Sequence, residues 1–470
     1  MSDKKYHLVI VESPAKAKTI EKYLGKDFKV LASKGHISDL PQKELGVDLK
    51  SFDLTIVPIP GKEDHIKELQ KAAAQADQVF LASDPDREGE AISFHLRDAI
   101  KRKDSRRVLF NAITKDAILE AMKHPQDLDE HKYEAQKTRR VLDRLVGYKI
   151  SPVLWDKLQR GLSAGRVQSV ALRIIVEREE EILAFVPEKW FQIIADLKKD
   201  DMEFEAKYYG SGISEKLELE DENVVKQILE DIKQKPFVVK DILNKEKKQN
   251  PTPPFTTSKL QQEAAHKLGF DSKKTMQIAQ KLYEGIEVQG QGRQGLITYM
   301  RTDSVRSEPQ AIEAVRKLIE EKFGADYLPA TPVAHAKKKA GVAAQDAHEA
   351  IRPTNFALNP ESIRSSLDYD EFRLYSLIWN KFVASQMNPA ILDQTTISFM
   401  VDKHCFKSSG SVVRFPGFKA VFSDSTDEKK GKKGEDEEKE QTPALPLMSM
   451  DENITPEKEP RLQEKWTQPP

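Results

Sequence analysis

The feature that most constrains the fold is a regular alternation of short apolar runs and amphipathic segments near the N-terminus. The apolar runs predict strands at residues 7–12, 28–32, 54–57, 78–84 and 107–110. The segments between them predict helices at residues 13–24, 64–76, 88–100 and 115–123. Strands that alternate with helices form a parallel sheet. Functional side chains in such sheets gather at the carboxyl ends of strands, where Glu12 and Asp84 lie.

The pattern changes after residue 128. Residues 130–184 predict a long helical region that is interrupted near 151–152 and 161–165. Strands are predicted at residues 191–209 and 237–243 around a helix at 220–233, and again at 392–401 and 411–421. Residues 257–387 predict mainly helices. Residues 424–470 are polar and rich in proline, which predicts a mobile tail without a core.

The charge and cysteine content narrow the class of protein. The chain has 470 residues, a net charge of −1 and a single cysteine, Cys405, which excludes an internal disulfide and a cysteine-based zinc site. No run of about 18 apolar residues exists and the N-terminus lacks the architecture of a signal peptide, so we expect a cytoplasmic protein. Residues 132–178 are rich in Arg and Lys, and a near-neutral total can conceal such a basic groove.

Three carboxylates at alternating positions, Asp84, Asp86 and Glu88, leave a predicted strand and enter a predicted helix. Mg²⁺ binds through a few carboxylate oxygens, so the run is a candidate magnesium site with Glu12 as a further ligand. The alternative is an acidic helix N-terminus that the helix dipole favours. Lys16, four residues after Glu12, can place a cation on a phosphate.

Residues 295–304 form a short apolar run that ends in Tyr299 and then turns polar. We expect Tyr299 at a strand end with Arg301 on the same face. A tyrosine hydroxyl, with a pKa of about 10, is a poor nucleophile at neutral pH without the help of a cation such as Arg301. Taken alone, a tyrosine that closes a strand is more often a packing residue.

The basic region offers a candidate nucleic-acid groove. Arg140 and Arg144 share a helix face, and Asp143 is spaced to pair with Arg139. Residues 161–169 form a loop of small residues that presents Arg166 and Gln168, to which a phosphate backbone could come close. The alternative is a salt-bridged surface helix followed by an ordinary connector.

His348 and Arg352 are four residues apart, which predicts one face of a helix that ends before Pro353. A lone histidine is more often structural, but His348 could polarise a phosphate. Together, the tyrosine, the carboxylates, the lysine and the basic groove suit phosphoryl transfer at a site between domains. The chain lacks the glycine-rich P-loop motif, so ATP is not implied.

These motifs resemble those of the type IA DNA topoisomerases. The resemblance rests on residues 9–18, 84–90, 143–148, 161–169, 297–304 and 347–353, in the family's order, and runs from about residue 7 to about residue 420. Met300 is typical of the bacterial topoisomerase I branch, whereas the topoisomerase III branch usually has proline there. The chain has Ala112 and Thr138 where the family commonly has glutamate and alanine.

The resemblance implies roles for the matching residues. Tyr299 attacks a phosphodiester of single-stranded DNA and keeps the 5′-phosphate, and Arg301 stabilises that phosphate. Glu12 protonates the departing 3′-oxygen, Lys16 neutralises the phosphate, and His348 lies beside it. The implied ligands of Mg²⁺ are Asp84, Asp86, Glu88 and Glu12. The implied DNA-binding residues are His36, Arg87, Arg140, Asp143, Arg144, Arg166, Gln168 and Arg352.

The implied activity is ATP-independent relaxation of negatively supercoiled DNA by a monomeric, nucleoid-associated isomerase. The implied fold class is a multi-domain α/β, α and β protein, in which a Rossmann-like Toprim domain precedes a toroidal core. We expect a Toprim domain at 1–128, a partial helical groove domain at 129–185, an arch at 186–252 and 390–424, a mainly helical tyrosine domain at 253–389, and a tail at 425–470. The core looks incomplete at its C-terminus.

Two other functions remain open. The first is a truncated fragment that binds or cleaves DNA without relaxing it. The second is a primase or nuclease with a Toprim domain, which the acidic motif alone would allow but which leaves Tyr299 and Arg301 unexplained.

Overall fold

The computed structural model describes residues 6–335, 349–423, 444–456 and 458–470. Contacts divide the chain into two compact units. One consists of residues 1–171 and 252–386, and the other of residues 172–251 and 387–470. Across the described residues, no helix combines the length and the apolar character that crossing a bilayer would take.

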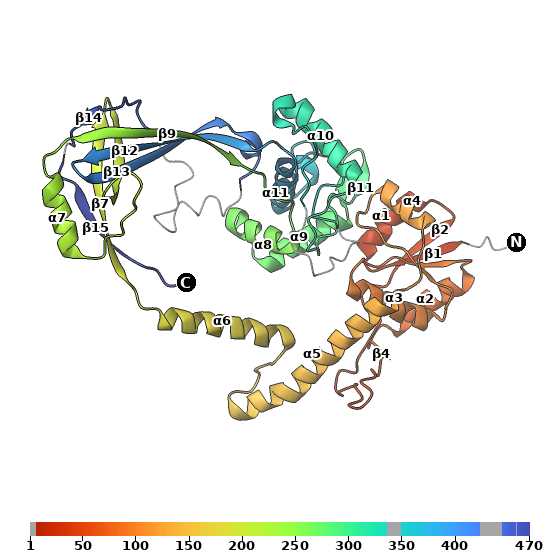
Figure 1. Ribbon diagram of the computed structural model, residues 1–470. Coiled ribbons are helices and arrows are strands. Elements are labelled where there is room, and N and C mark those ends of the chain that lie inside the picture. The colour runs from red at the N-terminus through yellow and green to blue at the C-terminus, as the bar shows by residue number, and fades with distance from the viewer. Residues whose placement is uncertain (1–5, 336–348, 424–443, 457) are drawn as a thin grey trace. The chain divides into compact units, whose positions relative to one another are not determined.

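The first unit contains the predicted parallel sheet, in the order β2-β1-β5-β6. Its strands are β1 (His7–Val11), β2 (Phe28–Ala32), β5 (Val79–Leu81) and β6 (Arg106–Arg107). Helices α1 (Pro14–Leu24) and α4 (Lys115–Lys123) lie on one face, and α2 (Glu63–Gln75) and α3 (Arg87–Ile100) on the other (Figure 1). The strand predicted at 54–57 is wrong: only β4 (Val57–Pro58) forms there, and it pairs with β3 (Ser38–Asp39) outside this sheet.

The loop after β5 is held tightly against the start of α3. Asp86 caps this helix by accepting a hydrogen bond from the Gly89 backbone N–H at 2.8 Å. A β-carbon at Gly89 would lie 2.1 Å from the Asp84 carbonyl oxygen, so only glycine fits. The loop that carries Asp84 and Asp86 is therefore fixed in position by the sequence of the helix that follows it.

The tyrosine-bearing part of the first unit is mainly helical, as predicted. Its helices are α8 (Thr257–Glu263), α9 (Ser272–Glu284), α10 (Pro309–Phe323) and α11 (Tyr369–Ser385), with shorter turns η1 (Ala264–Leu268), η2 (Ala325–Tyr327) and η3 (Arg364–Ser366). The short strands β10 (Ile286–Val288) and β11 (Gly292–Gln294) form a hairpin directly before the Tyr299 segment.

The Tyr299 segment is extended but is not the strand of a sheet that the sequence predicted. The backbone N–H of Tyr299 donates to the Asn111 carbonyl at 2.8 Å, and that of Thr298 donates to the Arg352 carbonyl at 3.0 Å. Ile297 forms a single antiparallel bridge with Pro353. Two separate segments, at Asn111 and at residues 352–353, thus satisfy the backbone groups that one neighbouring strand would otherwise satisfy.

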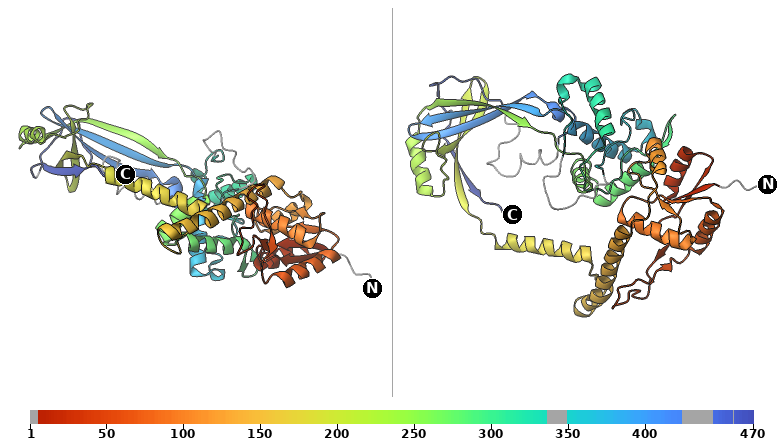
Figure 2. Two further views of the ribbon diagram at one scale, coloured as in Figure 1. Left: turned by 90° about the horizontal axis from the view of Figure 1, so that it is seen from below. Right: turned by 45° about the vertical axis from the view of Figure 1, so that its right-hand side comes forward.

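Two long helices occupy the predicted helical region, α5 (Glu130–Lys157) and α6 (Arg166–Ala184). The break at 158–165 agrees with the prediction, but the expected interruption at Ser151 and Pro152 is wrong because α5 continues through both residues. Proline has no N–H to donate to the carbonyl group one helical turn before it. Because Pro152 is exposed, water can bind that carbonyl group instead. Figure 2 shows α5 as a straight rod that starts against α3. No side chain of α6 is buried against the described part of the chain.

The second unit is built on a seven-stranded sheet in the order β14-β9-β12-β13-β8-β7-β15, and the pairings within it are antiparallel. The strands are β7 (Lys189–Lys199), β8 (Met202–Gly210), β9 (Phe237–Gln249), β12 (Ala390–Val401), β13 (His404–Phe415), β14 (Asn453–Ile454) and β15 (Arg461–Trp466). Helix α7 (Glu222–Ile232) covers its core, and η4 (Gly417–Ala420) follows β13.

The expected mobile tail is wrong for its described residues. Strand β15 pairs with β7 over six residues, and β14 pairs with β9 (Figure 1). Ile454 is buried in the sheet core, and Leu445 and Met448 pack against it. Cross-strand pairing and these few apolar anchors outweigh the polar composition on which the prediction relied.

Candidate active site

The carboxyl ends of β1 and β5 bring Glu12 and Asp84 together. The backbone N–H of Asp84 donates a hydrogen bond to Glu12 Oε1 at 3.0 Å. Lys16, in the first turn of α1, donates from Nζ to Asp84 Oδ1 at 2.5 Å, and this nitrogen lies 3.6 Å from Glu12 Oε2. The Lys16 side chain is only 1% exposed, so the site contains a buried cation between two carboxylates.

Burial and neighbouring charges shift the pKa values in this cluster. Burial, followed by the negative charge of Asp84, raises the pKa of Glu12 from 4.5 to about 7 against the opposing charge of Lys16. Burial alone would lower the pKa of Lys16, but the charges of Asp84 and Glu12 outweigh it and raise that pKa. Glu12 can therefore hold a proton at neutral pH while Lys16 stays charged. These are the states that a general acid and a phosphate-binding cation require.

Tyr299 and Arg301 both reach Asp86. The Tyr299 hydroxyl donates a hydrogen bond to Asp86 Oδ2 at 2.7 Å, and Arg301 Nη1 lies 3.5 Å from the same oxygen. Tyr299 is buried, whereas the Arg301 side chain is 59% exposed. The segment that follows α9 thus meets the loop that follows β5, as expected for a site assembled from distant parts of the chain.

The environment of Tyr299 keeps its hydroxyl protonated in this DNA-free state. Burial raises the pKa of Tyr299 well above its usual value, and the negative charges of Asp84 and Asp86 raise it further. Arg301 acts in the opposite direction but does not compensate. Arg301 alone therefore does not activate the tyrosine as the sequence suggested, and Asp86 is placed to accept the phenolic proton.

The candidate magnesium ligands do not converge in this conformation. Asp84 binds Lys16, Asp86 binds Tyr299, and Glu88 accepts a hydrogen bond from Gln136 Nε2 at 3.1 Å. Within the described ranges, no three His, Cys, Asp or Glu side chains are grouped as they are around a metal ion. The oxygen donors fit Mg²⁺ chemically, and the ammonium group of Lys16 supplies a positive charge between Glu12 and Asp84.

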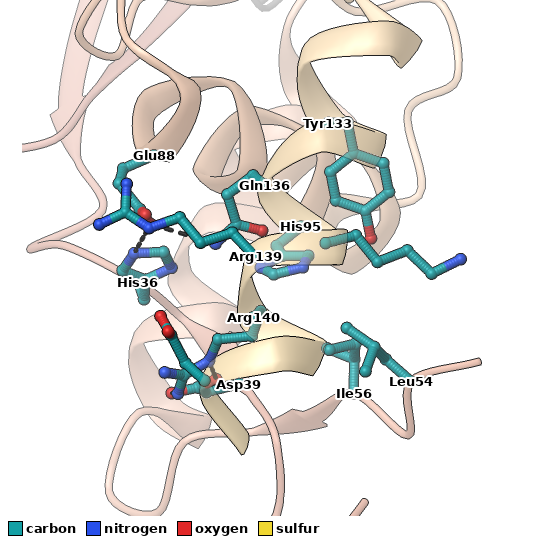
Figure 3. A pocket seen from close by; sticks show the side chains of 12 residues that line it. His36, Asp39, Leu54, Ile56, Glu88, His95, Tyr133, Gln136, Arg139 and Arg140 are labelled. Carbon is teal, nitrogen blue, oxygen red and sulfur yellow. Dashed lines mark hydrogen bonds and ion pairs between the residues drawn. The ribbon is translucent and has the colours of Figure 1, made fainter. Parts of the chain in front are cut away.

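A polar pocket of about 230 Å³ lies beside this cluster, between α3, the β3 loop and α5 (Figure 3). His36 Nε2 lies 3.6 Å from Glu88 Oε2, and this interaction with His36 is the main cause that lowers the pKa of Glu88. Arg140 holds Asp39 through two hydrogen bonds of 3.1 and 2.5 Å. The pocket therefore unites three predicted DNA-binding residues, His36, Arg140 and Asp143, with Glu88, which the sequence had assigned to the metal.

Other predicted groove residues lie further along α5 and α6. Asp143 pairs with Arg166 at 3.0 Å rather than with Arg139, because α6 brings Arg166 back to α5. Arg144 stacks on the Tyr148 ring with its guanidinium carbon 4.6 Å from the ring centroid. Gln168 is exposed in the first turn of α6, and Arg87 is exposed at the start of α3.

The prediction at residues 348–352 is wrong in its secondary structure. Ile351 forms an antiparallel bridge with Phe255, so the described residues directly before Pro353, 349–352, are not helical. Arg352 is buried and binds the Glu349 carboxylate at 2.7 Å, and its backbone N–H donates to Thr298 Oγ1 at 3.0 Å, which holds the Tyr299 segment. His348 lies outside the described residues.

Arg107 and Glu90 support the site from beneath, and sequence reasoning assigned neither a role. Arg107 is buried and donates to Glu90 Oε2 at 3.0 Å and to the carbonyl oxygens of Ser83 and Asp84 at 2.8 and 2.6 Å. Glu90 Oε1 accepts the backbone N–H of Asp129 at 2.8 Å, where α5 begins. The signal in the sequence was an arginine in the strand predicted at 107–110, because an arginine that is buried in a sheet requires such partners.

The comparisons with known proteins agree with this geometry. Residues 7–113 match the family model of the Toprim domain, and residues 127–470 match that of a DNA topoisomerase family. Among solved structures, the chain is similar to full-length topoisomerase I from Thermotoga maritima, with 39% sequence identity and a TM-score of 0.81. The similarity covers 98% of this chain and 72% of the Thermotoga chain.

Proposed function

This chain belongs to the bacterial type IA DNA topoisomerases, and we propose that it cuts and reseals one DNA strand where Tyr299 meets Glu12 and Asp86. The hydrogen bond between the Tyr299 hydroxyl and Asp86 is the observation that carries this proposal. It brings a hydroxyl group to a carboxylate that can accept its proton, in the same loop as Asp84, whose backbone N–H binds Glu12, and this supports a nucleophile, a base and an acid at one site.

In the proposed cleavage step, Tyr299 Oη attacks a phosphorus of single-stranded DNA. The bond from phosphorus to the 3′-oxygen breaks as the bond to Tyr299 forms. The phenolic proton passes along the existing hydrogen bond to Asp86, and Glu12 gives its own proton to the departing 3′-oxygen. Resealing reverses both transfers. The phosphotyrosine conserves the energy of the broken bond, so the reaction requires no ATP.

Lys16 and Arg301 stabilise the charge that develops on the phosphate. Lys16 is charged and buried, and a buried cation acts more strongly on a phosphate than one surrounded by water. Arg301 is exposed on the other side of Asp86 and can bind the phosphate through two N–H groups. When the phosphate arrives, Lys16 exchanges part of its contact with Asp84 for contact with the phosphate.

We place Mg²⁺ at Asp84 and Asp86, with Glu12 and Glu88 as further oxygen donors. Bound there, the ion would neutralise phosphate charge during resealing. For Asp84 and Asp86 to bind the ion, Asp84 would have to release Lys16 and Asp86 would have to release Tyr299. Because the arriving phosphate draws Lys16 partly away from Asp84 in the proposed cleavage step, Mg²⁺ and DNA are expected to support each other's binding.

We propose that a single strand of chromosomal DNA follows the pocket and α5, and that the protein acts as a monomer. The proposed contacts have a cationic or amide head that can bind a phosphate. They are His36, Arg87, Arg140, Arg144, Arg166 and Gln168, and Asp143 contributes by holding Arg166 in place. Arg140 and Arg166 are each paired with an aspartate and still partly exposed, so phosphate can compete for them.

A plasmid assay tests the proposed function. Negatively supercoiled plasmid is incubated with this chain and Mg²⁺ in the absence of ATP, and the topoisomers are separated on a gel. We expect a ladder of relaxed topoisomers that chelation of the metal abolishes. Plasmid that stays supercoiled while oligonucleotide is still cleaved would instead identify a cleavage-only protein.

The pKa of Glu12 predicts how cleavage depends on pH in the absence of metal. Its folded pKa of about 7 lies above the ordinary value of 4.5, so the proton that Glu12 must donate is present below about pH 7 and lost above it. Because Asp86 takes the phenolic proton within the step, ionisation of Tyr299 adds no opposing trend. The initial rate of oligonucleotide cleavage in a chelator should fall by about tenfold for each pH unit above 7.

The Glu12→Gln variant is the control for this pH profile. It should cleave slowly and show no fall above neutral pH, because glutamine has no proton to lose. A wild-type rate that stays level or rises between about pH 7 and about pH 8.5 would show that Glu12 is not the acid.

A further inference from the structure

A second tyrosine, Tyr283, lies at the centre of the site without a role in the steps above. It belongs to the last turn of α9 and is completely buried. Its hydroxyl makes no hydrogen bond within the described part of the chain. A buried hydroxyl without a partner is unfavourable, and phenylalanine would fill the same space without that cost. The hydroxyl therefore requires an explanation beyond packing.

The surroundings of Tyr283 are the reacting groups themselves. Its ring meets the Tyr299 ring edge-on with centroids 5.3 Å apart, and Lys16 Nζ lies 5.4 Å from its ring centroid. Burial raises the pKa of Tyr283 well above its usual value, and the negative charge of Asp84 is the next largest cause. An interaction of the hydroxyl with the Asp84 side chain, which falls short of hydrogen-bond geometry, acts in the same direction. The hydroxyl group of Tyr283 thus keeps its proton and lies close enough to Asp84 to interact with its negative charge. The α9 end is fixed there, since Thr19 Oγ1 of α1 donates to the Glu284 carbonyl at 3.1 Å.

We propose that Tyr283 is a positioning residue whose hydroxyl donates a hydrogen bond to Asp84 when Lys16 turns from Asp84 to the scissile phosphate. The inference rests on the proposed function, because it requires Lys16 to bind that phosphate. Before DNA binds, Lys16 Nζ donates a hydrogen bond to Asp84 Oδ1 at 2.5 Å, and the Tyr283 hydroxyl has no hydrogen-bond partner among the described residues. Once the ammonium group divides its contacts, Asp84 becomes a buried carboxylate in need of a donor, and Tyr283 supplies one.

This change of hydrogen-bond donor on Asp84, from Lys16 to Tyr283, gives the Tyr283 hydroxyl a function. A hydrogen bond to an ionised carboxylate is stronger than one between neutral groups. Because the bond forms as Lys16 turns to the phosphate, on which charge builds up during the reaction, it lowers the free energy of the transition state more than that of the DNA-bound state and does not stabilise the resting state. Tyr283 also keeps Asp84 from drawing Lys16 back during resealing.

The Tyr283→Phe variant tests the proposal. It keeps the ring against Tyr299 and Lys16 and removes only the hydroxyl. We expect the melting temperature to stay the same or rise, because an unsatisfied polar group is removed. Single-turnover cleavage and resealing of a labelled oligonucleotide should both slow by about 10- to 100-fold. A variant that cleaves and reseals at the wild-type rate overturns the proposal.

Tyr375→Phe is the matched control. Tyr375 is also a fully buried tyrosine of the first unit, but its hydroxyl already donates to the Leu358 carbonyl at 2.7 Å. This variant should show the reverse pattern, a lower melting temperature and unchanged cleavage. The Tyr283 result also differs from a failure of the proposed function, because in that case wild-type protein would form no Tyr299-dependent adduct at all.

A double variant supplies a readout that simple packing would not change. In the Lys16→Met background Asp84 lacks its cation, so the Tyr283 hydroxyl should already serve Asp84 in the resting state. Adding Tyr283→Phe should then lower the melting temperature, although the same substitution leaves it unchanged or raises it in wild-type protein. An equal effect of Tyr283→Phe in both backgrounds contradicts the exchange.

Discussion

Tyr299→Phe is expected to abolish the covalent protein–DNA adduct. The substitution removes the attacking oxygen and its hydrogen bond to Asp86, while the ring keeps its contact with Tyr283. We expect no other group in this site to replace the nucleophile, so the rate of adduct formation should fall on the order of 10⁴-fold or more. The measurement is a denaturing gel of protein incubated with a labelled single-stranded oligonucleotide.

Tyr23→Phe is a suitable control for Tyr299→Phe. Tyr23 lies in α1, and its hydroxyl donates to the Arg293 carbonyl at 2.9 Å, outside the reacting cluster. This variant should form adduct at the wild-type rate. The affinity of the Tyr299→Phe variant for DNA, measured by fluorescence anisotropy, should remain close to that of wild-type protein. Adduct formation by Tyr299→Phe equal to that of wild-type protein would mean that another residue is the nucleophile.

Lys16→Met has the largest expected effect on stability. The variant leaves Glu12 and Asp84 buried without their cation, and removal of one partner of a buried ion pair costs about 3–5 kcal/mol in the free energy of unfolding. The variant should also lose cleavage, because the phosphate loses its buried positive charge. Hydrogen exchange of the β1 and α1 amides, together with urea unfolding, measures the loss of stability.

The cost of Lys16→Met should depend on pH. Without the cation, the folded pKa of Glu12 rises further above its unfolded value, so the folded protein binds more protons than the unfolded chain. Stability then falls as pH rises, and the cost should be larger at about pH 8 than at about pH 5.5. Lys22→Met is the control: Lys22 is exposed on the same helix with a long 3.9 Å ion pair to Glu287, so its loss should change stability little at either pH.

The candidate site was predictable where function follows from the ends of regular elements. Glu12 and Asp84 end apolar runs of a parallel sheet, and this alone placed them together. The position of Lys16 near the same sheet edge was predictable because Ser13 caps the helix that begins directly after the first strand. The partners of each side chain were not predictable, because they depend on segments distant in the chain. Asp86 binds Tyr299 across 213 residues, and no local pattern distinguishes that contact from coordination of a metal.

The errors in the fold have the same origin. Arg352 and its neighbours have helical spacing, but pairing of Ile351 with Phe255 makes that segment extended. Strand β9 continues past the predicted end at residue 243 because its polar second half pairs with β12. Pairing of this kind satisfies backbone groups whatever the side chains are, so strand ends in polar segments cannot be read from apolar periodicity.

The buried bridge from Arg107 through Glu90 to Asp129 has a mechanical consequence. One end of the bridge holds the carbonyl oxygens of the loop that carries Asp84, and the other holds the first turn of α5. In the proposed function, α5 grips the DNA strand. Tension along a cut strand would therefore pass through this bridge to the loop that holds the reacting groups.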